Sequence, residues 1–421
     1  MAARDLAAWL EWQERLHPAE IELGLERVRT VLESMDLAQP PFRVATVGGT
    51  NGKGSCVAVL EALGLAAGWA TGAYTSPHLR RYNERVRIGG AEATDDELVA
   101  AFEAVEAARG RTSLSYFEFG TVAALEIFRR RGVEWAVLEI GLGGRLDAVN
   151  AVNPEVAVVT SIGLDHVEWL GPDRESIGRE KGGIFRPDRP AVIGDRDPPA
   201  TLLAAAGNDA LRLGRDFDWR AEGDRWRWHD LNGRVFADLP RGPLTAPVLL
   251  DNAACAIAAF DALGALSGDH TLPARALARM RLAGRLQRFN GPVEWWLDVA
   301  HNPDGAAVLA GALSAAPCSG RTIAVFGLLT DKDAPGVSAA LDACVDHWVL
   351  ASLPPPRGHP ADTLAAVIGP QLRGSLETAP SVAAACALAA AAARPGDRIV
   401  ACGSFHVVGP TLDWLEVYFA A

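Results

Sequence analysis

The segment from Val44 to Ser55 constrains the fold of this chain most. It reads Val-Ala-Thr-Val-Gly-Gly-Thr-Asn-Gly-Lys-Gly-Ser, so a short apolar strand runs into a glycine-rich turn that holds one lysine. A helix is expected over 55–65, where Val57, Leu60 and Leu63 have helical spacing. The backbone N–H groups of the turn, the positive end of the helix and the charge of Lys53 together predict a phosphate-binding loop.

The loop differs from the common P-loop pattern, in which Gly-Lys is followed directly by Ser or Thr. Here Gly54 separates Lys53 from Ser55. The alternative is a glycine turn that only joins a strand to a helix. The lysine between two glycines favours phosphate binding, because neither a turn nor its packing requires an amine at that position.

Length and charge limit the possible functions. A chain of 421 residues is too long for one ordinary core, so two domains are expected. The net charge of -12 argues against a nucleic-acid partner, and it implies that local geometry and metal hold any bound phosphate. The six cysteines are scattered without a Cys-x-x-Cys pair, which indicates a reduced, cytoplasmic protein. Neither a signal peptide nor an apolar stretch of membrane length is evident, so no membrane partner is expected.

Apolar strand-like runs alternate with helical segments through the first part of the chain, which predicts a buried parallel sheet. The expected strands cover 42–47, 135–140 and 156–161. The segment 216–239 is expected to form a small antiparallel meander, because Trp226 and Trp228 alternate with arginines. A nucleic-acid-binding stripe is the alternative there, and the negative net charge disfavours it.

A second α/β region follows a glycine-flanked hinge near 284–291. The alanine-rich run 382–393 is interpreted as a buried helix. The fold class is therefore α/β, with a P-loop mononucleotide-binding parallel-sheet domain over 1–286 and a smaller Rossmann-like α/β domain over 287–421. The expected strands of the second domain are 293–300, 322–327, 347–352 and 397–403.

Two further clusters follow predicted strands. Glu139 lies near the end of one apolar run, and Asp165 and His166 lie just past another. Ligands bind at the carboxyl ends of strands in open α/β sheets, and a metal–phosphate site needs oxygen and nitrogen donors from several strand ends. The alternatives are a structural ion pair of Glu139 with Arg145, and a packed or surface histidine at position 166.

Several ordered motifs together resemble the bifunctional dihydrofolate synthase/folylpolyglutamate synthase family, within the wider group of Mur-type ligases. The resemblance implies that ATP phosphorylates a pterin-linked carboxylate to an acyl phosphate, and that the amino group of L-glutamate then attacks it. The motifs are Gly-Thr-Asn-Gly-Lys-Gly-Ser (49–55), Thr-Ser-Pro-His-Leu (75–79), Asn-Glu-Arg-Val (83–86), Leu-Glu-Ile-Gly-Leu-Gly-Gly-Arg-Leu-Asp-Ala (138–148), Asp-Val-Ala-His-Asn-Pro (298–303) and Gly-Ser-Phe-His (403–406).

The matching motifs imply a set of site residues. Those expected to contact ATP are Thr50, Asn51, Gly52, Lys53, Gly54, Ser55, Asn252, Arg285 and Asp298. Two Mg²⁺ ions are expected, with Ser76 and Glu139 as ligands of one and His166 as a ligand of the other, and Lys181 is expected to be carbamylated into a metal ligand. The residues expected to act in catalysis are Lys53, Glu139, His166, Lys181 and Arg285.

The resemblance also implies where the other substrates bind. Pterin contacts are expected from Arg15, Leu16, His17 and Pro18 and from Ser115, Tyr116, Phe117 and Glu118, where aromatic faces stack on a flat ring. Core packing is the alternative for Tyr116 and Phe117. His301 and Ser404 are the candidates for L-glutamate. The expected protein is a monomer that acts on dihydropteroate and reduced folates.

Two other functions fit part of the pattern. A Mur-type cell-wall ligase usually carries an additional N-terminal domain for its UDP-linked substrate, whereas only about 40 residues precede the phosphate loop here. A nucleotide-dependent switch would need the loop but not Arg285, Asp298 and the second domain. Both are therefore less consistent with the sequence than a folate ligase.

Overall fold

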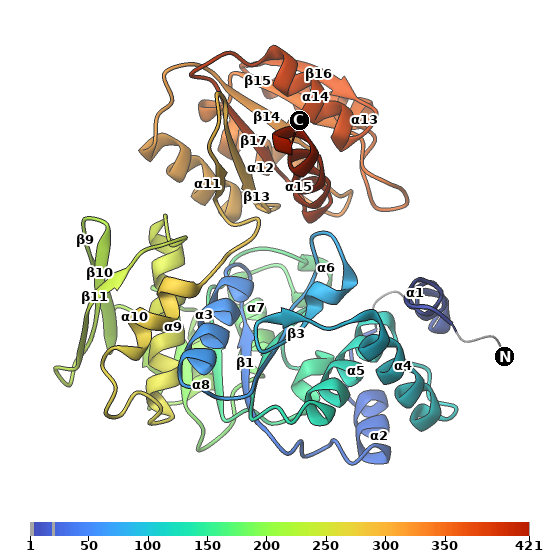
Figure 1. Cartoon of the computed structure of the whole chain (residues 1–421), viewed down its shortest axis with the longest axis vertical. Coiled ribbons are helices and arrows are strands. Elements are labelled where there is room, and N and C mark those ends of the chain that lie inside the picture. The colour runs from blue at the N-terminus through green and yellow to red at the C-terminus, as the bar shows by residue number, and fades with distance from the viewer. Residues whose placement is uncertain (1–3, 19–21, 421) are drawn as a thin grey trace. The chain divides into compact units, whose positions relative to one another are not determined.

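The computed structural model describes residues 4–18 and 22–420 and divides into two compact units (Figure 1). The first unit consists of Met1–His78, Tyr82–Gly242 and Leu249–Met280. The second consists of Leu79–Arg81, Pro243–Val248 and Arg281–Ala421. The chain therefore passes from one unit to the other several times, and two short segments belong to the second unit although their neighbours in sequence belong to the first.

The first unit is built on an eight-stranded sheet in the order β4-β3-β2-β5-β1-β6-β7-β8, as far as the chain is described. Its centre is parallel, and the strands predicted around residues 42, 135 and 156 pair there as β1, β5 and β6, which confirms them. The bounds are β1 (Arg43–Gly48), β2 (Thr71–Tyr74), β3 (Val86–Ile88), β4 (Ala91–Glu92), β5 (Trp135–Glu139), β6 (Val156–Val159), β7 (Ala191–Ile193) and β8 (Leu211–Arg212).

Helices surround this sheet. The predicted helix after the glycine-rich turn is confirmed as α3 (Lys53–Ala66), which begins two residues before the predicted start and buries Val57, Leu60 and Leu63 completely. The other helices are α1 (Leu6–Leu16), α2 (Glu26–Ser34), α4 (Asp95–Arg109), α5 (Tyr116–Arg130), α6 (Val167–Leu170), α7 (Arg174–Gly182), α8 (Ala200–Ala206), α9 (Pro247–Ala262) and α10 (Leu272–Arg279), with the short 3₁₀ turns η1 (Tyr82–Arg85) and η2 (Ala148–Ala151).

The predicted meander is a three-stranded antiparallel sheet of β9 (Phe217–Glu222), β10 (Arg225–Asp230) and β11 (Val235–Pro240). Trp226 and Trp228 are buried, and the indole of Trp228 donates a hydrogen bond to the carbonyl of Ala254 in α9 at 3.1 Å. The aromatic residues of the stripe therefore serve packing.

The second unit has a six-stranded sheet in the order β12-β13-β17-β14-β15-β16, in which only β12 runs antiparallel to its neighbour. Four strands match the predicted runs, and β12 and β16 were not predicted. The strands are β12 (Gln287–Phe289), β13 (Glu294–Asp298), β14 (Thr322–Phe326), β15 (His347–Ala351), β16 (Ser375–Ala379) and β17 (Arg398–Cys402). The helices are α11 (Pro303–Ala315), α12 (Ala334–Leu341), α13 (Ala361–Ile368), α14 (Val382–Ala392) and α15 (Phe405–Ala420), with the 3₁₀ turns η3 (Asp342–Cys344) and η4 (Gly369–Gln371).

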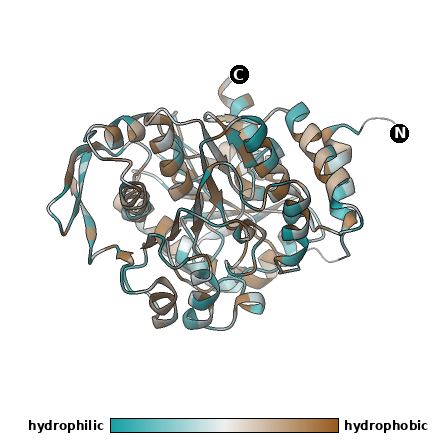
Figure 2. Ribbon diagram, turned by 90° about the horizontal axis from the view of Figure 1, so that it is seen from below, coloured by the Kyte–Doolittle hydropathy of each residue, from teal (hydrophilic) through white to brown (hydrophobic). Residues whose placement is uncertain are grey.

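The alanine-rich run forms α14, as predicted, but it is not a buried helix. Only one face, with Val382, Ala385, Cys386 and Ala389, is buried, while Leu388 is exposed. Other helices of the chain, unlike α14, carry both hydrophilic and hydrophobic residues (Figure 2). Within the described residues, no helix has both the length and the apolar character needed to cross a membrane.

Candidate active site

The glycine-rich turn between β1 and α3 is shaped by two neighbours. A Cβ atom on Gly49 would lie 2.0 Å from the hydroxyl oxygen of Thr160, and one on Gly52 would lie 2.6 Å from the side-chain amide of Asn252. Gly52 has a left-handed backbone and caps α3 without a side-chain hydrogen bond. The first N–H groups of α3 therefore keep no capping side chain and are placed to bind an anion.

The turn is also fastened to the chain that leaves β6. The N–H of Thr50 donates to the carbonyl of Ser161 at 2.7 Å, and the hydroxyl of Thr50 donates to the carbonyl of Gly163 at 3.1 Å. The hydroxyl of Thr160 donates to the carbonyl of Asn51 at 2.6 Å. These bonds hold the loop in one shape before any ligand binds, so little ordering remains for binding.

Lys181 lies beside this loop rather than in solvent. It belongs to α7, its side chain is buried, and its ammonium donates to the carbonyl of Gly49 at 3.1 Å. The ammonium of Lys53 donates to the same carbonyl at 3.0 Å. Burial, followed by the nearby charge of Lys53, lowers the pKa of Lys181 to about 7.

Glu139 ends β5 in a buried position, and its Oε2 accepts a hydrogen bond from the N–H of Ser76 at 3.3 Å. This contact brings together the two residues expected to bind one Mg²⁺. The alternative that Glu139 forms an ion pair with Arg145 is wrong, because Arg145 pairs with Glu180 instead, at 2.9 Å between Nη2 and Oε1.

His166 follows β6 and is the N-cap residue directly before α6, with a left-handed backbone at φ 52°. Its side chain is 29% exposed, and its Nε2 lies 3.9 Å from Oδ1 of Asp165. His166 is therefore neither fully buried nor fully exposed. Its imidazole is accessible from solvent, as a metal ligand must be before the metal binds.

Two buried polar atoms support nucleotide binding near the loop. The hydroxyl of Ser55 and the Nδ2 of Asn252 are buried and have no hydrogen-bond partner in the described chain. Such atoms are costly unless a ligand satisfies them. Within residues 4–18 and 22–420, no three His, Cys, Asp or Glu side chains gather closely enough to hold a metal. A metal site here would therefore need the hydroxyl of Ser76, a modified Lys181 or phosphate oxygens alongside Glu139 and His166.

Asp147 is a buried carboxylate close to Lys53 and Lys181 that the sequence interpretation did not single out. It is buried, and its carboxylate accepts hydrogen bonds from the N–H of Leu142 at 2.8 Å and of Val149 at 3.0 Å. Burial raises its pKa to about 7, and its charge acts on both Lys53 and Lys181. The available sequence signal was that Asp147 is the one charged residue between Arg145 and Glu155.

The candidates of the second unit gather at the carboxyl ends of β13 and β17. The carboxylate of Asp298 accepts hydrogen bonds from the N–H groups of Leu286 and Ala300, both at 2.8 Å, and burial raises its pKa. The guanidinium of Arg285 lies 5.2 Å from the ring centroid of Phe405. The ring centroids of His301 and Phe405 are 6.2 Å apart. Ser404 is buried two residues after the end of β17.

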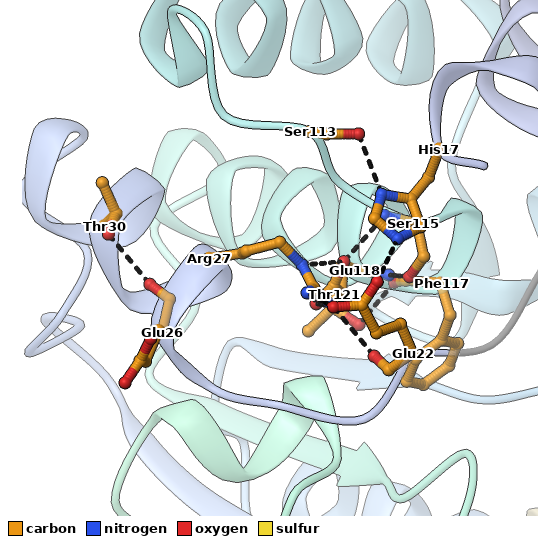
Figure 3. Close-up of polar contacts among 10 residues, drawn as sticks. All are labelled: His17, Glu22, Glu26, Arg27, Thr30, Ser113, Ser115, Phe117, Glu118 and Thr121. Carbon is orange, nitrogen blue, oxygen red and sulfur yellow. Dashed lines mark hydrogen bonds and ion pairs between the residues drawn. The ribbon is translucent and has the colours of Figure 1, made fainter. Parts of the chain in front are cut away.

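A hydrogen-bonded chain connects His17 and Glu118, two of the predicted pterin residues of the first unit (Figure 3). The imidazole of His17 bonds to the hydroxyl of Ser113 at 2.8 Å and to the carboxylate of Glu22 at 2.7 Å. Arg27 pairs with Glu22 and, at 2.9 Å, with Glu118. His17 and Glu118 therefore have structural partners of their own.

The remaining pterin candidates are arranged around the start of α5. Ser115 caps this helix, while Tyr116 and Phe117 are half-buried rather than part of the closed core. The Phe117 ring lies 5.9 Å from that of Tyr74, and a Cβ on Gly141 would come within 2.6 Å of it. Arg15 pairs with Glu11 on the surface, Leu16 packs on the core, and Pro18 is exposed. Whether these residues bind a pterin stays a prediction.

Family models match two parts of the chain. The Mur ligase middle domain matches residues 47–235, and the Mur ligase glutamate ligase domain matches residues 284–405. The first match contains the glycine-rich loop, Glu139, His166 and Lys181. The second contains Arg285, Asp298, His301 and Ser404.

Relatives resemble the chain over nearly its whole length. The dihydrofolate synthase/folylpolyglutamate synthase of Escherichia coli (strain K12) is 42% identical over 418 residues, which cover 99% of this chain and 96% of the relative. A structure described as E. coli FolC in complex with DHPP and ADP matches with a TM-score of 0.93, covering 100% of this chain and 99% of that one at 42% identity. A bifunctional folylpolyglutamate synthase/dihydrofolate synthase with Mn, AMPPNP and L-glutamate bound matches with a TM-score of 0.89, covering 99% of each chain at 41% identity.

Proposed function

The chain belongs to the dihydrofolate synthase/folylpolyglutamate synthase family of Mur ligases, and we propose that a single ATP site serves both of its reactions. The chain is an ATP-dependent ligase. It adds L-glutamate to 7,8-dihydropteroate, forming dihydrofolate, and to reduced folates, forming folylpolyglutamates. In each reaction ATP converts the acceptor carboxylate into an acyl phosphate, because a free carboxylate is a poor electrophile.

The fixed loop is the proposed phosphate site. Thr50 to Ser55 supply backbone N–H groups, the hydroxyl of Ser55 and the ammonium of Lys53, and Asn252 lies against Gly52 with an unsatisfied amide nitrogen. Donors fixed in advance stabilise the charge that develops during phosphoryl transfer without reorganising at that moment.

Two Mg²⁺ ions are proposed to bind next to the loop. Ser76 and Glu139 would hold one, and His166 and carbamylated Lys181 the other. When bound, the ions would neutralise charge on the phosphates and on the acceptor carboxylate. The hydrogen bond from the backbone N–H of Ser76 to the carboxylate of Glu139 supports the first pair, because it holds the two residues next to each other at the carboxyl ends of β2 and β5.

The single observation that carries the proposal is the position of Lys181. A buried lysine whose amine meets the carbonyl of Gly49 next to Lys53 is poorly placed as an ammonium. Addition of CO₂ to its neutral amine would replace that positive charge with a negative one, and the carbamate oxygens would suit a divalent cation. The low pKa of this amine makes the reactive neutral form available near pH 7.

The two predicted domains divide the remaining tasks. Residues 1–286 are proposed to bind ATP and the pterin, and residues 287–421 to bind L-glutamate through His301 and Ser404. Arg285 and Asp298 are proposed to contact ATP, and the enzyme is proposed to act as a cytoplasmic monomer. Asp298 accepts two backbone hydrogen bonds, so its orientation is fixed before a ligand arrives.

The proposal is tested by following ADP release with ATP, Mg²⁺ and L-glutamate in the presence of one acceptor at a time. Dihydropteroate and tetrahydrofolate should each support ADP release that requires glutamate, whereas a UDP-muramoyl precursor should not. ADP release without an acceptor, or with the muramoyl precursor alone, would contradict the assignment.

A further inference from the structure

The side chain of Arg85 is held in place by its neighbours, which engage only part of its hydrogen-bonding capacity. It ends η1, directly before β3, and its Nε donates a hydrogen bond to Nδ1 of His78 at 2.9 Å. Its guanidinium carbon lies 5.2 Å from the ring centroid of Tyr82 and 5.6 Å from that of Tyr116. Its two terminal nitrogens have no hydrogen bond or ion pair with any residue in the described part of the chain.

Arg87 shows what a structural arginine looks like at this edge of the sheet. It binds both carboxylate oxygens of Glu61 and donates to the hydroxyl of Thr75 and to the carbonyl of Glu84. Arg85, two residues earlier, forms no ion pair with a carboxylate among residues 4–18 and 22–420. A guanidinium with a fixed plane and two available terminal nitrogens matches the geometry of an external carboxylate.

The backbone of Arg85 places it next to the proposed metal ligands. Its carbonyl accepts a hydrogen bond from the N–H of Thr75 at 2.9 Å, and the next residue, Ser76, donates to Glu139. The reacting carboxylate of any acceptor must come close to these residues. The side chain of Arg85, however, extends to Tyr116, in the aromatic segment proposed to bind the pterin.

We propose that Arg85 binds the α-carboxylate of the terminal glutamate of folate acceptors. This inference rests on the proposed function. A folate acceptor presents two carboxylates separated by a three-carbon chain, of which the γ-carboxylate reacts and the α-carboxylate must be held beside it. Dihydropteroate ends in the reacting benzoate carboxylate alone and offers Arg85 no second anion. Arg85 is therefore a specificity-determining residue of the folylpolyglutamate synthase reaction.

The first test compares kcat/KM for tetrahydrofolate and dihydropteroate in Arg85→Gln and Arg85→Lys. Loss of a charge-assisted hydrogen-bonded pair should reduce kcat/KM for tetrahydrofolate about 10- to 100-fold in Arg85→Gln, mainly through KM, because the contact is the same before and during reaction. Arg85→Lys should retain part of the activity. Activity on dihydropteroate should change less than about twofold. Arg131→Gln, which removes an exposed arginine paired with Glu97, controls for net charge.

The second test uses a tetrahydrofolate analogue in which 4-aminobutyrate replaces glutamate, so that the reacting carboxylate remains and the α-carboxylate is absent. The kcat/KM of the parent enzyme for this analogue should be as low as the kcat/KM of Arg85→Gln for tetrahydrofolate. On the analogue itself, the parent and Arg85→Gln should have the same kcat/KM. The inference would be overturned if Arg85→Gln reduced kcat/KM equally for dihydropteroate and tetrahydrofolate. It would also be overturned if Arg85→Gln reduced kcat/KM for the analogue as much as for tetrahydrofolate.

The two proposals fail in different ways. A parent enzyme that uses tetrahydrofolate but not dihydropteroate contradicts the proposed dual function. The comparison of tetrahydrofolate with the analogue still decides the role of Arg85 in that case, because both of those acceptors react through the same γ-carboxylate.

Discussion

The ammonium groups of Lys53 and Lys181 share one acceptor, the carbonyl oxygen of Gly49, at 3.0 and 3.1 Å. Lys181 is buried, so the repulsion between the two charges is poorly screened by water. Binding of an anion between them, or conversion of Lys181 to a carbamate, would change this repulsion into attraction.

Lys181→Ala should be inactive and partly rescued by short carboxylic acids, because a carboxylate can occupy the position vacated by the carbamate. The parent protein should show a mass increase of one CO₂ on Lys181, and its activity should fall in CO₂-free buffer. If Lys181 acts as an unmodified ammonium, added carboxylic acids give no rescue and the mass of the side chain is unchanged.

The stability of the metal-free and CO₂-free protein should rise with pH above about 7. Burial lowers the pKa of Lys181 to about 7 from its ordinary 10.5, so between these values the unfolded chain binds a proton that the folded protein does not. The free energy of unfolding then increases with pH, by at most about 1.4 kcal/mol per pH unit. Urea unfolding at several pH values should show this slope in the parent and not in Lys181→Met.

Glu139→Gln and His166→Ala should each abolish turnover while the unfolding temperature stays close to that of the parent. Each change removes a proposed metal ligand without opening a large cavity. Glu168→Gln is the matched control, because Glu168 is exposed on α6 two residues after His166. Turnover near the parent rate at saturating Mg²⁺ in both variants would contradict the metal assignment.

Gly52→Ala should lose ATP binding, whereas Gly68→Ala should not. Both glycines have a left-handed backbone, at φ 87° and 82°, so alanine should cost about 1 kcal/mol of stability at either position. Only the Cβ at position 52 would approach Asn252, at 2.6 Å, while nothing lies within 4 Å at position 68. Calorimetric titration with ATP and thermal unfolding separate the two effects, and equal ATP affinity in both variants would contradict the role of the loop.

Phe117→Leu and His17→Ala should reduce kcat/KM for dihydropteroate more than for tetrahydrofolate. The two acceptors differ in length, so one ATP site can serve both only if the pterin is held at two different places. Phe117 contacts Tyr74 and lies over Gly141, and His17 holds Glu22 and Ser113 together. Equal losses for the two acceptors would show that these residues do not form a separate dihydropteroate pocket.

The sequence predicted the elements whose signal is local. The apolar runs of β1, β5 and β6 and the glycine-lysine turn could be read from a few adjacent residues. The strand β16, Ser-Leu-Glu-Thr-Ala, was missed because it lies at the edge of its sheet and its polar residues face solvent. Likewise β12 has only three residues, too few to show a period.

The partners of the site residues could not be predicted in the same way. The contact of Gly52 with Asn252 and the pairing of Arg145 with Glu180 join segments far apart in sequence, and single-sequence patterns contain no information on such distances. Lys181 illustrates the limit. On residue type alone a lysine is expected in solvent, and only the packing of α7 beside the loop buries it.

The short segment Leu79–Arg81 has a consequence for how this protein could change during evolution. Leu79 packs on the core of the second unit, its carbonyl occupies the space that a Cβ on Gly409 would need, and Arg80 pairs with Asp413 and Glu416 of α15. A single genetic crossover at Arg281 would therefore transfer the sheet of this unit without the tripeptide that completes its core. Exchange of this unit between relatives requires compatible residues at 79–81 as well, so the two parts of the chain are expected to have been inherited together.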